Sequence, residues 1–404
     1  MPSSLDSAPK RVLFVDHVSR ILGGAEINLV ELLEHPPASW RPAVACAAGQ
    51  HLSRALPRGN IEQFDYALPE RLNTFRLAGR SFSILNGLRS WKEIQRVAAQ
   101  LDAILTRFQP DAVISCTGKD HFAAAIACRT QHRPSIWWVN DIISKDFFSW
   151  PVRAAFIREA RRNAARIVVV SNFAQRVLLD SGLPAQKVVT IANGIPLAKY
   201  QRTGHGELRR QIGISSEEPL IGVVGRFTPW KGQEFFLKIA QAWLQKKQSG
   251  HFVLVGTAFN EDQQYECKLR EFVQAQIPPG RVHFVPFQQD IGQTLSDLDL
   301  LLHTSLKPEP FGRVLIEAMA IGTPVVAAAN GGVPEIIAHN ETGLLARPGE
   351  LGSYLEQLQF AFTHRERMAA LATAARVRVE NHFTIERVRR QFAELVENIA
   401  PAYK

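Results

Sequence analysis

The stretch Lys307-Pro-Glu-Pro-Phe-Gly-Arg-Val-Leu-Ile-Glu-Ala-Met-Ala-Ile-Gly-Thr-Pro-Val-Val326 contains two glutamates on either side of a Phe-Gly turn. A helix is expected to begin near Arg313, which places Glu309 in the preceding loop and Glu317 about one turn inside the helix. The first backbone N–H groups of a helix have no intrahelical partner and attract anions. Carboxylates accept hydrogen bonds and hydroxyls donate them, so the two glutamates suit a sugar and a ribose. The stretch therefore predicts a nucleotide-sugar site.

Length and composition indicate a soluble globular chain with two domains. The 404 residues exceed one ordinary core, and 46% are hydrophobic while 21% are charged. No apolar run approaches the roughly 18 residues of a membrane span, and the polar start of the chain lacks the apolar core of a signal peptide. The four cysteines have neither disulfide nor metal spacing: Cys46, Cys116, Cys128 and Cys267. A reducing, cytoplasmic location is expected.

Positive charge is concentrated in the first half of the chain. Residues 1–200 hold 25 Lys and Arg against 16 Asp and Glu, whereas residues 201–404 hold 22 of each. Two basic stretches rich in large apolar residues account for part of this excess, at 71–96 and 147–166. Such stretches suit the inner face of an anionic membrane, as a peripheral contact, or form ordinary amphipathic helices with solvated faces. No nucleic-acid-binding motif accompanies the charge, so nucleic acid is not an expected partner.

Short apolar runs alternate with helical patterns along the whole chain, which predicts an α/β fold with parallel sheets buried on both faces. The expected strands are Arg11–Val15, Pro42–Ala47, Ala112–Ser115, Ile136–Val139, Ile167–Val170, Val188–Ile191, Leu220–Val224, His251–Val255, Val282–Phe284, Leu298–Leu302 and Pro324–Ala327. The expected helices include Ala25–Leu33, Trp91–Phe108, Trp150–Ala164, Gln233–Gln245, Cys267–Gln276 and Arg313–Ala320. The Gly- and Pro-rich segment 194–219 is the expected joint between domains.

Several motifs occur in the order found in one enzyme family. They are Gly23-Gly24-Ala25-Glu26, Val170-Ser171-Asn172, Asn193-Gly194-Ile195, Gly225-Arg226-Phe227 with Lys231-Gly232, Glu309 to Glu317, and Gly331-Gly332-Val333-Pro334-Glu335 followed by Thr342-Gly343-Leu344-Leu345. On these motifs the chain resembles the retaining glycosyltransferases of family four. The resemblance implies the glycosyltransferase B fold, with two facing Rossmann-like domains and an interdomain cleft. The expected domains are residues 1–195 and 196–383, with a last helix at about 384–404 packing back on the first.

The resemblance also assigns roles to individual residues. A departing diphosphate gains negative charge and needs fixed cations, and Arg226 and Lys231 match the pair that holds it. Glu309 would contact hydroxyls of the transferred sugar, and Glu317 would bind the ribose. The helix start at Phe311, Gly312, Arg313 and Val314 and the loop at Gly23 and Gly24 would approach the donor. Taken alone, Gly23-Gly24 is also compatible with a simple tight turn.

One motif departs from the family pattern. Many members have His followed by an acid after the fourth strand, whereas this chain reads Trp137-Trp138-Val139-Asn140-Asp141. Asn140 forms hydrogen bonds but cannot exchange a proton at neutral pH. Asp141 is the acid expected near the acceptor, and His121 is either a substitute for the missing histidine or a structural residue.

No metal or cofactor is expected besides the nucleoside diphosphate sugar, which is a co-substrate. Asp297-Leu298-Asp299 has the spacing of a metal-binding Asp-x-Asp motif, but it opens an apolar strand where the family carries a structural aspartate. Other Cys, His and carboxylate residues lack ligand spacing. Transfer is therefore expected to be metal-independent.

The sequence predicts transfer of a sugar from a nucleoside diphosphate to an acceptor hydroxyl. The family retains anomeric configuration, the leaving phosphate helping to deprotonate the acceptor, so no covalent nucleophile is assigned. The basic first half favours a lipid-linked or saccharide acceptor from envelope glycolipid or polysaccharide synthesis. Two alternatives stay open: a nucleotide-sugar epimerase of the same fold and a catalytically silent nucleotide-sugar-binding scaffold.

Overall fold

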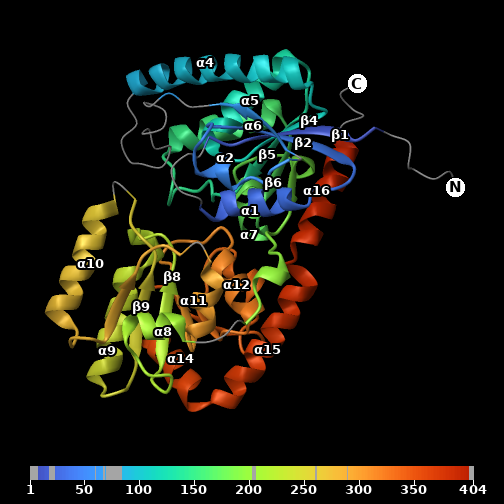
Figure 1. Ribbon diagram of the computed structural model, residues 1–404. Coiled ribbons are helices and arrows are strands. Elements are labelled where there is room, and N and C mark those ends of the chain that lie inside the picture. The colour runs from blue at the N-terminus through green and yellow to red at the C-terminus, as the bar shows by residue number, and fades with distance from the viewer. Residues whose placement is uncertain are drawn as a thin grey trace. The chain divides into compact units, whose positions relative to one another are not determined.

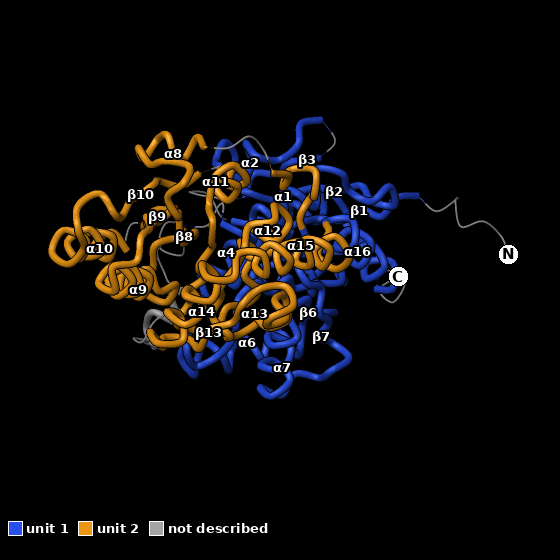
Figure 2. Tube along the Cα trace, turned by 90° about the horizontal axis from the view of Figure 1, so that it is seen from below, with its two compact units in different colours: residues 1–194, 385–404 blue, residues 195–384 orange. Residues whose placement is uncertain are grey.

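The computed structural model describes residues 8–17, 23–59, 61–66, 69, 84–202, 206–259, 262–288 and 290–399. The chain divides into two compact units, which Figure 2 colours separately. The first consists of residues 1–194 and 385–404, and the second of residues 195–384. Each unit is described by itself below.

The first unit is built on a seven-stranded parallel sheet with the order β3-β2-β1-β4-β5-β6-β7. Its strands are β1 (Lys10–Val15), β2 (Trp40–Cys46), β3 (Glu62–Asp65), β4 (Ala112–Ser115), β5 (Ser135–Val139), β6 (Ala164–Val169) and β7 (Val188–Thr190). Its helices are α1 (Gly24–Glu34), α2 (His51–Ala55), α4 (Ile84–Phe108), α5 (Gly118–Thr130), α6 (Trp150–Asn163), α7 (Asn172–Asp180) and α16 (Ile385–Ile399) (Figure 1).

Helices cover both faces of this sheet because successive strand residues point to opposite sides. Val12 and Phe14 of β1 pack in a core with α1 and α16, whereas Leu13 and Val15 pack in a core with α4 and α5. Buried on both sides, the inner strands are largely apolar, as the sequence pattern predicted.

The second unit repeats this architecture on a six-stranded parallel sheet with the order β10-β9-β8-β11-β12-β13. Its strands are β8 (Leu220–Val224), β9 (His251–Val255), β10 (Val282–Val285), β11 (Leu300–His303), β12 (Val325–Ala328) and β13 (Leu344–Ala346). Its α-helices are α8 (Glu207–Ile212), α9 (Gln233–Gln245), α10 (Gln263–Gln276), α11 (Ile291–Asp297), α12 (Arg313–Ile321), α13 (Val333–Ile336), α14 (Leu351–Thr363) and α15 (Arg365–His382).

The last helix, α16, belongs to the first unit although it follows the second in sequence. The ring of Phe392 lies 4.8 Å from the ring of Trp138 in an edge-on contact. Arg389 donates to the backbone carbonyls of Glu31 and Leu32, in the last turn of α1. A cation there pairs with carbonyls that lack intrahelical partners and with the negative end of the helix dipole.

Two parallel α/β sheets confirm the predicted fold class, and the differences concern element ends and short strands. The sequence pattern missed β3, a polar edge strand, and β13, which has three residues. Helix α4 begins at Ile84 rather than Trp91. Much of the basic stretch at 71–96, up to residue 83, lies outside the described residues.

Candidate functional site

The predicted donor residues of the second unit follow two neighbouring strands at a point where the strand order reverses. Strand β8 has β9 on one side and β11 on the other. Arg226 and Lys231 follow β8, and Glu309 follows β11. In open α/β sheets, ligands bind outside the carboxyl ends of the strands at such a switch point. Topology thus brings together residues that lie 78 positions apart in sequence.

Lys231 and the buried Glu309 form an ion pair at this switch point. The Nζ atom of Lys231 lies 2.8 and 2.7 Å from the two carboxylate oxygens of Glu309. The same carboxylate accepts a hydrogen bond from Ser305 Oγ at 2.9 Å and lies 3.2 Å from His303 Nε2. Burial raises the pKa of Glu309, but Lys231 and His303 outweigh it, so the pKa stays well below its usual range. Glu309 is therefore a carboxylate at neutral pH.

Two glycines let the surrounding loops approach this pair. A Cβ on Gly331 would lie 2.1 Å from the backbone oxygen of Glu309, and one on Gly232 would lie 2.1 Å from that of Thr304. Both glycines have positive φ angles, 65° and 76°. The hydroxyl of Thr304 also bonds the backbone of Lys231 and Gly232, at 3.1 Å each. The loops after β8, β11 and β12 are thus packed backbone to backbone around Glu309.

Helix α12 begins where the sequence predicted, directly after Gly312, whose φ is 103°. Arg313 Nε bonds Glu317 Oε1 at 2.7 Å, and the hydroxyl of Tyr200 lies 2.9 Å from the Arg313 guanidinium and 3.1 Å from Glu317 Oε1. Glu317 is thus held in a buried triad, and Val314 occupies the second position of the same first turn. Phe311 is buried, its ring 5.8 Å from that of Phe383.

Within the described part of the chain, Arg226 forms no hydrogen bond or ion pair with Lys231 or Glu309. Its side chain is exposed, and its guanidinium carbon lies 5.5 Å from the centre of the Phe259 ring. Gln233 Nε2 bonds the Arg226 backbone oxygen at 2.9 Å and so fixes the loop that carries it.

The predicted residues of the first unit follow β1 and β5. The backbone N–H of Gly23 donates to Glu26 Oε2 at 2.6 Å, which closes a cap at the start of α1. Asn140 and Asp141 directly follow β5, and Asn140 Nδ2 lies 3.5 Å from the Trp138 backbone oxygen.

His121, the proposed substitute for the missing histidine, lies in the interior. Its ring stacks on Trp137 with 5.0 Å between centres, and Nδ1 lies 2.7 Å from Ser115 Oγ. Burial lowers the pKa of His121 to about 3, so its imidazole is neutral at physiological pH. These contacts favour a role for His121 in core packing over a role as a substitute for the missing histidine.

Sequence reasoning missed two histidines at the switch points, His303 beside Glu309 and His17 beside Asp120. His303 is the last residue of β11 and His17 follows β1 by two residues, and each pairs with a carboxylate further along the chain. A polar residue at or just after the end of an apolar strand is the sequence signal that could have identified each histidine. The carboxylate with which it pairs depends on which strands are neighbours in the sheet.

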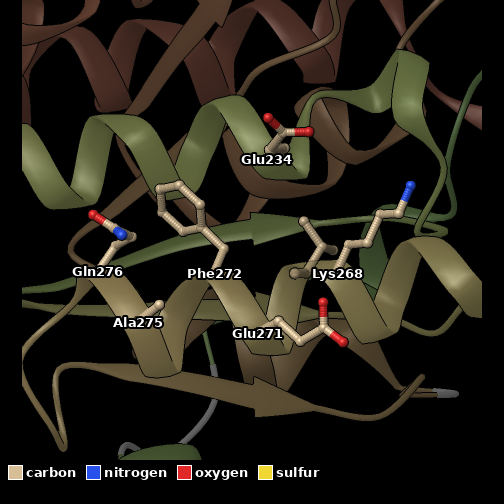
Figure 3. A pocket seen from close by; sticks show the side chains of 7 residues that line it. Glu234, Lys268, Glu271, Phe272, Ala275 and Gln276 are labelled. Carbon is tan, nitrogen blue, oxygen red and sulfur yellow. The ribbon is translucent and has the colours of Figure 1, made fainter.

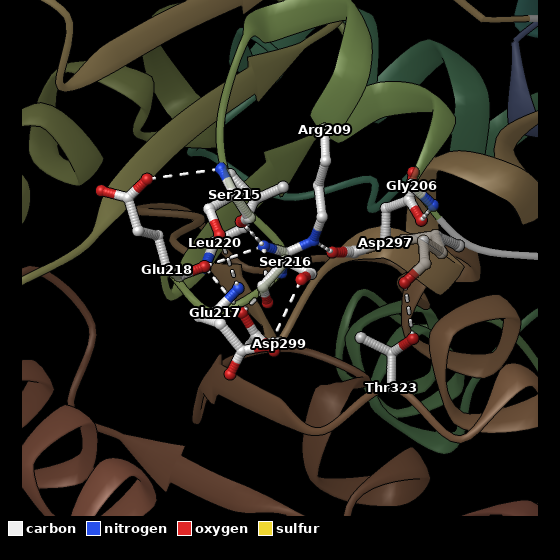
Figure 4. Close-up of polar contacts among 11 residues, drawn as sticks. Gly206, Arg209, Ser215, Ser216, Glu217, Glu218, Leu220, Asp297, Asp299 and Thr323 are labelled. Atoms are coloured by element: carbon white, nitrogen blue, oxygen red, sulfur yellow. Dashed lines mark hydrogen bonds and ion pairs between the residues drawn. The ribbon is translucent and has the colours of Figure 1, made fainter.

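The two carboxylates of the Asp297-Leu298-Asp299 motif accept hydrogen bonds from groups of the protein itself (Figure 4). Asp297 accepts from the backbone N–H groups of Gly206 and Leu208 at 2.6 and 2.8 Å. Asp299 accepts from Arg209 and from the backbone of Leu220, both at 2.7 Å. Over the described part of the chain, no cluster of three or more His, Cys, Asp and Glu residues could hold a metal ion.

A surface pocket lies away from these residues, along α9 and α10 (Figure 3). Its lining mixes two glutamates and a lysine with Phe272, Leu269, Ala275 and Gln276. It contains none of the motif residues, and its Glu234 pairs with Lys238 on the same helix. The motif residues therefore define the candidate site.

Two family models match the chain, one to each half. Glycosyltransferase Family 4 matches residues 22–199, and Glycosyl transferases group 1 matches residues 205–378. With two Rossmann-like domains and a family model matched to each, the chain belongs to the family-4 glycosyltransferases of the glycosyltransferase B fold. This confirms the family predicted from the motifs.

Individual relatives are distant and cover the chain to different extents. The chain is 25% identical over 320 residues to lipopolysaccharide core biosynthesis mannosyltransferase LpsB of Rhizobium meliloti, covering 76% of this chain and 91% of that enzyme. It is 27% identical over 216 residues to N-acetyl-alpha-D-glucosaminyl L-malate synthase of Bacillus anthracis, covering 54% of this chain and 55% of that enzyme. The crystal structure of Anabaena HepE in complex with UDP and glucose matches with a TM-score of 0.82 at 27% identity, over 96% of this chain and 99% of HepE.

Proposed function

We propose that this protein transfers a sugar from a nucleoside diphosphate sugar to an acceptor hydroxyl. The observation that carries the proposal is the ion pair between Lys231 and the buried Glu309 at the β8–β11 switch point, next to the start of α12. Lys231 and Arg226 would hold the departing diphosphate, because charge that develops in the transition state is stabilised by cations already in place. Glu309 would accept hydrogen bonds from the sugar.

Glu317 would bind the ribose of the donor. Arg313 and Tyr200 engage Oε1 and so fix the carboxylate in one orientation. The carboxylate would accept hydrogen bonds from the ribose hydroxyls. A UDP-sugar is the first donor to test, because HepE has been solved with UDP-glucose as well as with UDP and glucose.

The transfer is proposed to retain anomeric configuration and to need no metal. Cationic side chains at the donor site take the part that a divalent ion plays elsewhere in stabilising a diphosphate. NMR of the product made from an α-linked donor would read the configuration, and an inverted product would contradict retention. Full activity after dialysis against EDTA is the expected result for metal independence.

The proposed acceptor is a lipid-linked or saccharide molecule of envelope glycolipid or polysaccharide synthesis, reached from the cytoplasm. Relatives support this class, including LpsB and amylovoran biosynthesis glycosyltransferase AmsK of Erwinia amylovora. In the described chain, no helix is long and apolar enough to span a bilayer. Helix α6 begins with Trp150, which is 72% exposed, and carries the exposed residues Arg158, Arg161 and Arg162 in its second half, a composition that suits peripheral contact with anionic lipid.

Donor binding and turnover test the proposal in sequence. A ligand at 100 times its Kd stabilises the folded state by about 2.7 kcal/mol, so a thermal-unfolding screen of UDP, GDP, ADP and dTDP sugars should give a shift with one nucleotide. The shift should be lost in Glu317→Ala and kept in Lys238→Ala, which removes an exposed ion pair of the same unit.

The products then distinguish the alternatives. Release of nucleoside diphosphate that depends on an added acceptor supports transfer. Conversion of the donor sugar without an acceptor would indicate an epimerase. Binding without turnover of any donor and acceptor pair would indicate the silent scaffold that Asn140 suggests.

A further inference from the structure

The second unit contains a further cavity, at the edge of its sheet opposite to the candidate donor residues. Its volume is about 550 Å³, and its lining includes Pro219, Leu300 and Pro324, which lie at or just before the first residues of β8, β11 and β12. Lys231 and Glu309 instead follow the carboxyl ends of β8 and β11. Because these strands are parallel, their amino ends share one edge of the sheet and their carboxyl ends the other. The cavity is therefore separate from the candidate donor site.

One face of α15 forms a wall of this cavity. Six residues of the helix line it, at the spacing that places side chains on a single helix face. They are Arg365, Met368, Ala369, Ala372, Thr373 and Arg376. The two arginines stand at the ends of the row, and the four side chains between them are uncharged. Three of those four are small, so the row is hollowed between its charged ends.

The floor of the cavity is apolar. Leu300, Ile321 and Met368 line it although each is at most 4% exposed. Phe362 adds a half-buried aromatic ring. Gly322 also belongs to the lining, and a Cβ built on it would meet no atom within 4 Å. An apolar group could thus enter and leave water without displacing a side chain.

The charged groups of the lining leave two arginines available. The lining contains three arginines and two carboxylates, namely Arg202, Arg365, Arg376, Glu217 and Asp299. Asp299 is engaged by Arg209 at 2.7 Å (Figure 4), and Arg376 lies 3.0 Å from Glu380. Within the part of the chain that the structure describes, Arg202 and Arg365 form no hydrogen bond or ion pair. Two cations and Glu217 remain, which gives the rim a net positive charge.

We propose that this cavity binds a small organic anion, a phosphate or carboxylate carried on an apolar body. A guanidinium presents parallel N–H donors that match either group, so Arg365 and Arg202 would hold the anionic end. Leu300, Ile321 and Met368 would cover the apolar body. The volume falls in the range of roughly 300–1,000 Å³ that small-molecule sites occupy. The inference does not depend on the proposed glycosyl transfer.

A neutral sugar suits this lining less well than such an anion. The floor offers a sugar no hydrogen-bond partners, and the two hydroxyls of the lining are already engaged. Thr373 donates to the Ala369 backbone oxygen at 2.9 Å, and Ser216 donates to Glu217 at 3.3 Å. Two sources share the favoured chemistry, a soluble phosphorylated metabolite and a lipid phosphate, and the probes below distinguish them.

The first test titrates the full-length protein with phenyl phosphate and with hexyl phosphate in a calorimeter. At least one probe should bind at one equivalent, more tightly than inorganic phosphate by about tenfold or more, because only the probes bury an apolar body. A preference for phenyl phosphate would assign the site to an aromatic metabolite, and a preference for hexyl phosphate to a lipid phosphate. Binding of both no tighter than that of inorganic phosphate would overturn the proposal.

The second test changes the cavity at exposed positions of α15. Arg365→Ala should weaken the tighter probe by roughly 10–100-fold, since a hydrogen bond to a charged group is lost. Thr373→Trp should fill the cavity and abolish binding. The matched control, Ala374→Trp, adds the same side chain at the next position, which is also exposed but lies outside the lining, and it should bind as the wild type does. A Thr373→Trp protein with unchanged affinity would contradict the assignment.

The third test separates this cavity from the donor residues. Lys231→Met should bind the probe within about threefold of the wild type, because substitutions at distant sites act independently. Arg365→Ala should keep the donor-induced thermal shift that Lys231→Met loses. If Lys231→Met lost the probe as well, the probe would occupy the donor site and the proposal would fail. A wild type that binds the probe but no nucleotide sugar would instead refute the proposed function alone.

Discussion

Replacing Lys231 by methionine removes the cation from a buried carboxylate while keeping an unbranched apolar stem. In the wild type, Lys231 Nζ contacts both oxygens of Glu309, whose side chain is 8% exposed, while that of Lys231 is 24% exposed. The variant leaves Glu309 with hydrogen bonds from His303 and Ser305 alone.

The size of the effect follows from this burial. Breaking a fully buried ion pair costs about 3–5 kcal/mol because the remaining charge has lost its partner. Water reaches Lys231 in part, and two donors remain on Glu309, so we expect about 2–3 kcal/mol of lost unfolding free energy. For a unit of this size, each kcal/mol corresponds to about 2–4 °C in Tm.

The deficit should depend on pH with a defined sign. The folded pKa of Glu309 lies below its unfolded value, mainly because Lys231 and His303 overcome burial. The resulting stability is fully present above the unfolded pKa of about 4.3 and is lost as pH falls toward the folded pKa. The gap between wild type and variant is therefore largest near neutral pH and shrinks below about pH 4.

Calorimetry of both proteins between about pH 2 and pH 8 provides the measurement, with Lys238→Met as the control. Lys238 Nζ lies 2.7 Å from Glu234 Oε1, but both side chains are about half exposed, so that variant should lose no more than about 0.5 kcal/mol. Adding Glu309→Gln to Lys231→Met should recover part of the loss, since the uncompensated charge disappears. Equal losses in Lys231→Met and Lys238→Met would refute the reasoning.

Three further variants test other parts of the structure. Gly331→Ala should lower both stability and donor affinity, because the added Cβ would meet the Glu309 backbone at 2.1 Å. Gly322→Ala is the control, since Gly322 has a similar positive φ of 86° and nothing within 4 Å of the added Cβ. That variant should cost only about 1 kcal/mol of stability and leave donor affinity, measured by titration calorimetry, unchanged. The wild type should lose stability as pH falls from about 6.5 toward 3, because in that range only the unfolded chain protonates His121. His121→Phe should not show this part of the loss. Identical curves of stability against pH for the two proteins would contradict this prediction. Phe392→Ala should cost about 3–5 kcal/mol in denaturant unfolding of the first unit, and a loss under 1 kcal/mol would show that α16 is not part of that core.

Much of the fold was predictable because local pattern and buried environment agree. Strands such as Leu220–Val224 and His251–Val255 have the predicted bounds, since parallel strands covered on both faces are continuously apolar. The strand Glu62–Asp65 escaped detection because an edge position tolerates polar side chains. Its sequence carries no apolar run for that reason.

The sequence allowed residues of the candidate site to be predicted only where they belong to short motifs. Glu309, Glu317 and Lys231 follow from short sequence patterns, and the structure adds that Lys231 and Glu309 touch. The pairing of His17 with Asp120 could not be predicted, because 103 residues separate them. Only the order of strands in the sheet places the ends of β1 and β4 side by side, and that order is a property of the whole domain.

The return of α16 to the first unit has a consequence for synthesis on the ribosome. Residues 1–194 are translated before the second unit, yet the core around Trp138 lacks Val388, Phe392 and Val396 until α16 has been made. The second unit is continuous in sequence and can complete its core earlier. The unit whose translation starts first is therefore the last to be finished, and a nascent chain that stalls near residue 384 would expose the apolar face that α16 covers.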